Sequence, residues 1–199
     1  MTGDFIESSA EEIRSNVTSV AERLARAGAR VEQIAPPPSF GELAKAFWTI
    51  LSTEPAAYHK EALENRPDTF DPKTEQFLAK GLTTPAVKYL HALEVQRRVR
   101  RETAEILKHH DAILVPSTNF TAPAGLDSTG DPVFNNPWSM SGSPVVGLPS
   151  GLSGQGLPMA IQLVGAAFAE GRLLALARWC EQVLAFQEMP SRVYDQLEK

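Results

Sequence analysis

The part of the sequence that most constrains the fold is residues 111–165, where three short apolar runs alternate with loops rich in Gly, Pro, Ser and Asn. The runs cover residues 112–115, 144–148 and 159–164. Apolar runs of this length bounded by turn residues are typical of buried strands. Residues 149–156 join the last two runs and contain three glycines, which can supply the positive φ angles of a chain reversal. The last two runs are therefore predicted to form a hairpin.

The loop at residues 116–137, between the first and second runs, has no periodicity of its own. A loop of that length in a compact domain is usually either functional or disordered. This loop carries Phe120 and Phe134 and leads directly into Trp138. A solvated linker would not need three large aromatic side chains, so we expect the loop to pack over another part of the chain.

Before this region, periodic apolar residues predict a helix that begins at a cap on Ser8 or Ser9. Gly28 is expected to close that helix in the left-handed conformation. Residues 30–34 then alternate polar and apolar side chains, which is typical of a half-buried strand. The helix and this strand would together form an α/β unit.

Further helices are expected on both sides of the apolar runs. Their predicted ranges are residues 40–53, 72–81, 86–109 and 170–186, with residues 54–71 less regular. Ser39 would cap the first of them, and Asp71 before Pro72 fits a cap followed by a proline in the first helical turn. The spacing predicts that these helices bury Leu43, Phe47, Ile50, Leu51, Val87, Leu90, Leu93, Val99, Ile106, Leu107, Leu173, Leu174, Leu176, Ala177, Cys180 and Val183.

Composition limits the class of protein. The 199 residues, 43% hydrophobic and 22% charged, can bury a sizeable core, and we predict a single unit over residues 1–199 that ends in a tail at residues 189–199. A net charge of -5 argues against a nucleic-acid partner. Cys180 has no second cysteine to pair with and fits a core position in a reducing compartment. Without a membrane-length apolar run or a signal-peptide pattern, we expect a cytoplasmic protein with no membrane partner.

No motif for a metal, a cofactor or a phosphate loop is found. The four histidines, at positions 59, 91, 109 and 110, lack partners at metal-ligand spacing, so neither a metal nor a cofactor is expected. Serines are plentiful near the second apolar run, but a serine nucleophile needs a positioned base and none is visible there. Turn hydroxyls are the simplest interpretation of these serines.

A basic cluster lies on the helix predicted over residues 86–109. Its members are Arg97, Arg98, Arg100 and Arg101. One interpretation is a solvated helix face on which the arginines pair with Glu94, Glu102 and Glu105, since pairs three or four residues apart are the usual use of such a pattern. An anion site is the alternative.

Five segments, taken in order, resemble the C-terminal part of amidase signature enzymes. They are D-x-I-L-V-P-S at residues 111–117, A-P-A-G at 122–125, F-N-N-P-W-S-M-S-G-S-P at 134–144, G-L-P-S-G at 147–151 and G-L-P-M-A-I-Q-L-V-G at 156–165. The resemblance extends upstream and covers essentially the whole chain. It implies an α/β fold, namely the C-terminal portion of an amidase-type mixed β-sheet flanked by helices.

The same resemblance implies what this chain would lack. The family hydrolyses or transfers carbon–nitrogen amide bonds with a serine nucleophile, a second serine in a cis peptide and a lysine base, all of which lie in its N-terminal half. No Gly/Ser-rich stretch or lysine of this chain matches those elements. The resemblance therefore implies no catalytic residue here, and the isolated chain is predicted to be inactive as an amidase.

By resemblance, residues 134–142 would lie near the substrate cleft. Asn135, Trp138 and Ser139 are the predicted substrate-binding residues, because an aromatic and two polar groups on an irregular segment could form an apolar wall with a few hydrogen-bonding partners. The alternative is that Trp138 belongs to the core and Asn135 to a turn.

Two functional hypotheses follow. The chain could be the C-terminal piece of a cytoplasmic amidase that acts on a small amide only with an N-terminal half, its partner being that half or a second copy. Alternatively, it could be a free-standing, non-catalytic remnant or binding module with the same scaffold. Uncovered strand edges and apolar helix faces would favour the first hypothesis.

Overall fold

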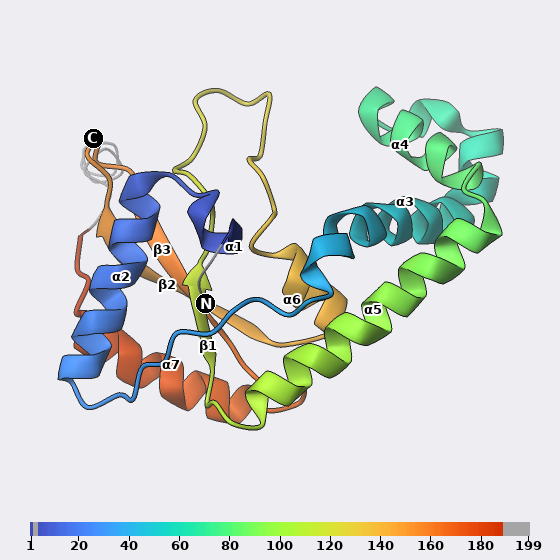
Figure 1. Ribbon diagram of the computed structural model, residues 1–199. Helices are drawn as coiled ribbons and strands as arrows, with labels where there is room; N and C mark the ends of the chain where they lie inside the picture. The colour runs from blue at the N-terminus through green and yellow to red at the C-terminus, as the bar shows by residue number, and fades with distance from the viewer. Residues whose placement is uncertain (2–3, 189–199) are drawn as a thin grey trace.

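The computed structural model describes residue 1 and residues 4–188 of the chain (Figure 1). Its elements follow in the order α1 (Asp4–Glu7), α2 (Glu11–Arg26), α3 (Phe40–Asn65), the 3-10 helix η1 (Pro67–Thr69), α4 (Pro72–Leu82), α5 (Ala86–Leu107), β1 (Ile113–Pro116), α6 (Asn136–Ser141), β2 (Val145–Leu152), β3 (Pro158–Val164) and α7 (Glu170–Leu184). The predicted tail at residues 189–199 lies outside the described residues.

The three apolar runs form one sheet, as predicted from their length and boundaries. The strand order is β1-β3-β2, and both pairings are antiparallel, so β2 and β3 make the predicted hairpin. Of the three turn glycines, only Gly156 has a positive φ, at 75°. The other two, Gly151 and Gly154, do not use the left-handed region that their residue type permits.

The central strand β3 is covered on both faces. Helices α2 and α7 lie against one face (Figure 1), where Leu148, Ile161 and Leu163 join their apolar residues in one core cluster. On the other face, Val115 and Val164 pack with Trp138 of α6 in a second cluster. Because successive side chains of a strand point to opposite faces, β3 supplies residues to both clusters. The prediction that the apolar run at residues 159–164 forms a buried strand is confirmed.

Helices α3, α4 and α5 form an arm that extends away from the sheet (Figure 1). Leu43, Ala46 and Ile50 of α3 pack against Val95 and Val99 of α5 in a third core cluster. At the far end, α4 lies against α3 so closely that a Cβ added to Gly81 would stand 2.0 Å from the backbone oxygen of Ser52. Any larger residue at position 81 would therefore force α3 and α4 to shift apart.

Two predictions about the N-terminal half are wrong. Residues 30–34 form no strand, so the expected α/β unit is absent: the Val31 side chain is 46% exposed, and only Ile34 of the alternating pair packs against the core. Helix α3 does not end near residue 53 but continues through Pro55 to Asn65. Proline removes one helical hydrogen bond, yet the helix continues past it and the next residue, Ala56, is fully buried.

Of the cap predictions, those for Asp71 and Gly28 are confirmed and those for Ser8 or Ser9 and for Ser39 are wrong. Asp71 accepts a hydrogen bond from the backbone N–H of Lys73 at 2.9 Å, as predicted, and Gly28 has the expected positive φ. Ser9 and Ser39 make no cap bond. The backbone N–H of Ser39 instead donates to the carboxylate of Glu102 on α5, at 3.0 Å. Long-range packing has replaced the local cap at this position.

Spacing identified the apolar helix faces but not which faces are covered. Most residues predicted to be buried are buried or half-buried, including Cys180. The exceptions are Leu51, Val87, Leu90 and Leu174, which are exposed. No helix within the described part of the chain is long and apolar enough to cross a membrane.

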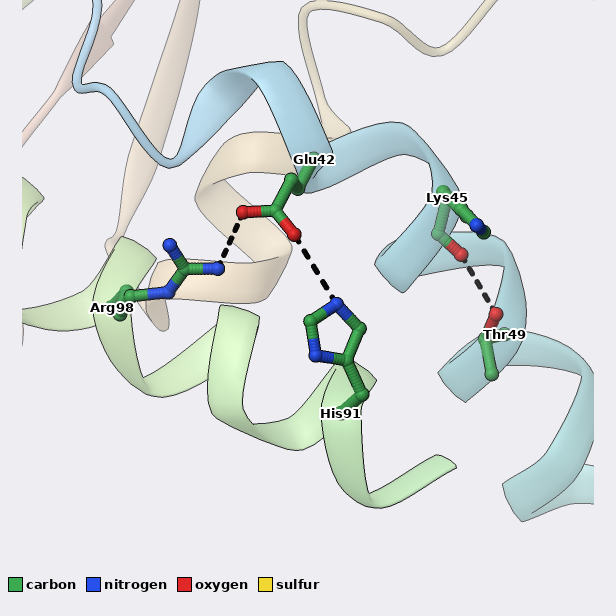
Figure 2. Close-up of polar contacts among 5 residues, drawn as sticks. All are labelled: Glu42, Lys45, Thr49, His91 and Arg98. Atoms are coloured by element: carbon green, nitrogen blue, oxygen red, sulfur yellow. Dashed lines mark hydrogen bonds and ion pairs between the residues drawn. The ribbon is translucent and has the colours of Figure 1, made fainter. Parts of the chain in front are cut away.

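An ion-pair cluster joins α3 to α5 near the base of the arm. Figure 2 shows the Glu42 carboxylate between Arg98, at 2.6 Å, and His91, at 3.2 Å. The hydrogen bond from Arg98 is the main cause that lowers the pKa of Glu42. Within the described residues, Arg97 pairs with Glu94 and the Nε of Arg100 donates to the Met140 carbonyl. The interpretation as a paired helix face is supported for Arg97 and Glu94, whereas Glu105 pairs with Lys108 and Glu102 accepts from the Ser39 backbone instead of pairing with the arginines as predicted.

We predict that Gly81→Ala destabilises the fold. Alanine normally stabilises a helix interior relative to glycine by about 1 kcal/mol. Here the new methyl group would overlap the Ser52 carbonyl, and overpacking of this kind costs about 1–3 kcal/mol. Urea unfolding measures the loss, with Gly41→Ala as the control, because a Cβ at Gly41 meets nothing within 4 Å. Equal stability of the two variants would contradict the close α3–α4 contact.

A second prediction concerns pH. A carboxylate with a lowered folded-state pKa adds stability above its ordinary value, 4.5 for Glu42, and that stability is lost as the pH falls through the lowered pKa. Glu42→Gln should therefore lower the melting temperature at pH 7, and the difference from the wild type should shrink below pH 4.5. Glu22→Gln, at an exposed position of α2 with no ion pair in the described structure, is the control.

Candidate functional site

Helix α6 is held over the sheet by aromatic residues from three parts of the chain. Phe134 and Trp138 are almost completely buried. The Phe5 ring of α1 contacts Phe134 with centroids 4.8 Å apart, and the Phe40 ring of α3 contacts Trp138 at 6.0 Å. The expectation that the long loop packs over another part of the chain is confirmed for Phe134, where the loop enters α6, but not for Phe120, which is 40% exposed. Edge-to-face contacts of this kind fix the position of the short helix.

A hollow of about 360 Å³ lies between α6 and the sheet. It is lined by Asn135, Trp138, Ser139, Gly142, Ser143, Val145 and Gln162. The three residues predicted to bind substrate therefore border one space. Asn135 and Ser139 are exposed, whereas Trp138 is only 2% exposed and belongs to a core cluster as well. Trp138 is thus both a core residue and part of the wall, and the binding role of the three residues stays a prediction.

Gln162 of β3 is a further residue of the hollow, and the sequence motifs did not single it out. Its side-chain Nε2 donates to the carbonyl oxygens of Pro116, Ser117 and Phe134, at 3.0, 3.3 and 3.2 Å. Gln162 therefore ties β3 to the end of β1 and to the loop that enters α6. Its sequence signal is a single polar residue inside the apolar run at residues 159–164.

The serines at this site do not form a nucleophilic centre. The Ser141 hydroxyl donates to the Trp138 carbonyl and contacts the Ser143 hydroxyl at 2.9 Å. Among the described residues, no lysine or histidine side chain hydrogen-bonds to a serine hydroxyl. Without an adjacent base a serine hydroxyl is a weak nucleophile, so these groups can recognise a ligand but have no means of activation within the described structure.

A second, larger groove of about 550 Å³ adjoins the hollow and shares Ser139 with it. Its other lining residues are Phe47, Ile50, Leu51, Glu54, Pro55, Tyr58, His59, Gln96 and Met140, so it runs between the arm and α6. Glu54 accepts a hydrogen bond from the Tyr89 hydroxyl at 2.8 Å, and this bond raises the pKa of Tyr89. The groove is mainly apolar with a few polar groups, a composition common in small-molecule sites.

Metal ligation has no support in the described part of the chain, where no group of three or more His, Cys, Asp or Glu side chains is placed to hold an ion. The His110 Nδ1 lies 2.8 Å from the Ile106 carbonyl at the end of α5. Cys180 is buried in the core, and burial raises the pKa of its thiol, which keeps it protonated.

Comparison with known proteins gives one family. A family model described as "Amidase" matches residues 1–174. A glutamyl-tRNA(Gln) amidotransferase subunit of Granulibacter bethesdensis is 34% identical over 116 residues, which are 55% of this chain and 23% of that relative. A solved structure described as "Crystal structure of amidase" has a TM-score of 0.79 and 28% identity over 90% of this chain and 44% of its own.

A further solved structure superimposes with a TM-score of 0.77 and 25% identity, over 92% of this chain and 41% of its own. It is described as an inhibitor-bound complex of "an unexpected vestigial protein complex" that reveals the origins of an s-triazine catabolic enzyme. The chain thus spans less than half the length of the relatives it matches. The shared fold confirms the predicted architecture, although the sheet within this chain is entirely antiparallel.

We predict a large loss of stability when a buried residue of the hollow is truncated and almost none when an exposed one is. Trp138→Ala removes a buried indole and should destabilise the fold by about 3–5 kcal/mol. Ser139→Ala removes an exposed hydroxyl and should change stability by no more than about 0.5 kcal/mol. Denaturant unfolding of both variants measures the difference. A small effect of Trp138→Ala would contradict the core role of that side chain.

Proposed function

This chain belongs to the amidase family, and from that premise we propose that it is the C-terminal part of an enzyme that hydrolyses non-peptide amide bonds. In that enzyme it completes the sheet and forms one wall of the substrate cleft. The observation that carries the proposal is the hollow beside α6, which the three predicted binding residues Asn135, Trp138 and Ser139 border together. A site with an aromatic wall and a few polar groups suits a small amide.

The proposal assigns binding to this chain and bond cleavage to the rest of the enzyme. The family resemblance puts the two catalytic serines and the catalytic lysine outside the matched motifs. The absence of a base hydrogen-bonded to any serine in the described structure is consistent with that division. The adjoining groove of the arm would receive the apolar part of the substrate, since Phe47, Ile50 and Met140 line it.

The partner we propose is a polypeptide that supplies the remaining part of the amidase fold. Two features support such a partner. The sheet ends in β1 and β2, whose outer edges pair with no strand in the described structure, and unpaired edges invite strand addition. Apolar side chains also lie uncovered, among them Val145 on β2 and Val87 and Leu90 on the arm. A second copy of this chain is the alternative occupant.

A second candidate function is a free-standing binding module that keeps the scaffold without catalysis. The isolated site favours it, because polar groups border the hollow and no described lysine or histidine side chain hydrogen-bonds to a serine hydroxyl. For either function we propose a cytoplasmic location, since the buried free thiol of Cys180 suits a reducing compartment.

The proposal predicts that the purified chain does not hydrolyse a simple aryl amide. The decisive experiment reads the DNA and the transcript upstream of the Met1 codon. We expect an open frame that encodes a lysine followed by a Gly/Ser-rich stretch, joined to this frame or adjacent to it. Co-expression should then give amide hydrolysis that the isolated chain lacks. Hydrolysis by this chain alone, abolished by a Ser→Ala change within it, would overturn the proposal, and the absence of such a frame would favour the binding module.

In the active assembly, Asn135→Ala and Ser139→Ala should each raise KM by about 2- to 10-fold, the range expected for one lost hydrogen bond. Both side chains are exposed, so assembly and folding should not change. Ser128→Ala, in the exposed loop away from the hollow, is the matched control. An equal KM for all three variants and the wild type would contradict the placement of Asn135 and Ser139 in the substrate cleft.

A further inference from the structure

The orientation of the Gln162 side-chain amide is fixed by its surroundings. Three backbone carbonyl oxygens, of Pro116, Ser117 and Phe134, converge on one of its two terminal atoms. Carbonyl oxygens accept hydrogen bonds and cannot donate them, so the atom that faces them must be the NH₂ group. The amide carbonyl oxygen, Oε1, therefore has to point away from these three acceptors.

The Oε1 atom is an acceptor whose partner is missing from the described structure. Gln162 is only 4% exposed, yet it lines the hollow, and no described residue donates a hydrogen bond to its Oε1. The Oε1 atom is not one of the buried side-chain atoms that lack a partner in the described structure, so it is open to the hollow, where a donor that enters can bond to it. The three bonds on the NH₂ side also prevent the amide from rotating to present a donor instead.

Strand register keeps the space next to this acceptor open. Gln162 of β3 lies directly opposite Gly147 of β2, and side chains opposite each other stand on the same face of a sheet. Gly147 has no side chain, and an added Cβ would meet nothing within 4 Å. Any larger residue at position 147 would therefore stand beside the Gln162 amide and occupy this space.

The rest of the lining defines the charge of the ligand. The residues that border the hollow are Asn135, Trp138, Ser139, Gly142, Ser143, Val145 and Gln162, and none of them is charged. A charged ligand would lose hydration without gaining a counter-charge there. The hollow suits a neutral molecule that offers at least one hydrogen-bond donor to Oε1.

We propose that Gln162 is a specificity-determining residue that accepts a hydrogen bond from the N–H of a neutral carboxamide ligand. Gly147 provides the room for that contact. The ligand class is a primary or secondary carboxamide, while esters and N,N-disubstituted amides, which have no N–H, are selected against. This inference rests on the proposed function, since it names the substrate class of the same hollow.

The test is NMR titration of the full ¹⁵N-labelled chain with three matched probes. Benzamide carries the N–H, whereas methyl benzoate and N,N-dimethylbenzamide do not. We expect benzamide to shift the resonances of residues around the hollow and to bind about 3- to 10-fold more tightly than the other two probes, as one neutral hydrogen bond predicts. Equal affinity for the three probes at the hollow would overturn the role of Gln162 and leave the cleft wall intact.

Two variants complete the test. Gly147→Val should weaken the binding of benzamide by at least about 10-fold, because its side chain occupies the space beside Oε1, while valine suits a strand and should not lower stability. Gly154→Val, at a turn position where a Cβ meets nothing within 4 Å, is the control. Gln162→Met should remove the preference for benzamide over methyl benzoate, and the same spectra report whether that variant is folded.

The outcomes separate the two proposals. Unchanged benzamide binding in Gly147→Val would put the ligand elsewhere and overturn the role of Gln162. If none of the three probes shifts any resonance around the hollow, the cleft wall itself is overturned, and the Gln162 inference falls with it. A folded Gln162→Met variant that still prefers benzamide would also overturn the inference.

Discussion

The structure depends on the burial of β3 from both sides. This strand pairs with β1 on one edge and β2 on the other, and its alternate residues enter two different cores. Ile161 and Leu163 face the layer of α2 and α7, whereas Val164 faces α6 and the end of α5. Gln162 lies among these apolar residues and ties β3 to two neighbouring segments. A central strand covered on both faces therefore joins the layer of α2 and α7 to α6 and the end of α5.

Local sequence signals predicted those parts of the fold that local physics decides. The three apolar runs became strands, Asp71 capped α4, and Gly28 took the positive φ. Predictions failed where distant contacts decide. Ser39 bonds through its backbone to Glu102 across the arm, and α3 continues through Pro55. Periodicity identified an apolar stripe but could not state which stripe would be covered, so Val87 was placed in the core wrongly.

The candidate site, like the fold, could be predicted from the sequence only in part. Asn135, Trp138 and Ser139 came from a resemblance of motifs, and they do border one hollow. Gln162 was missed because its part in the hollow depends on two facts that no short window of sequence contains. One is the convergence of three carbonyl oxygens from separate segments, and the other is the register that sets it opposite Gly147. A lone polar residue within an apolar strand is the signal to pursue in such sequences.

Helix α6 belongs to two cores at once. Its Trp138 packs with β1 and β3, and its Met140 packs with α3 and α5, two residues further along. Ser139, between them, borders both the hollow and the groove of the arm. The arm and the hollow therefore share one short helix as a wall. A ligand in the groove and a ligand in the hollow would therefore contact the same residue of the same short helix, Ser139.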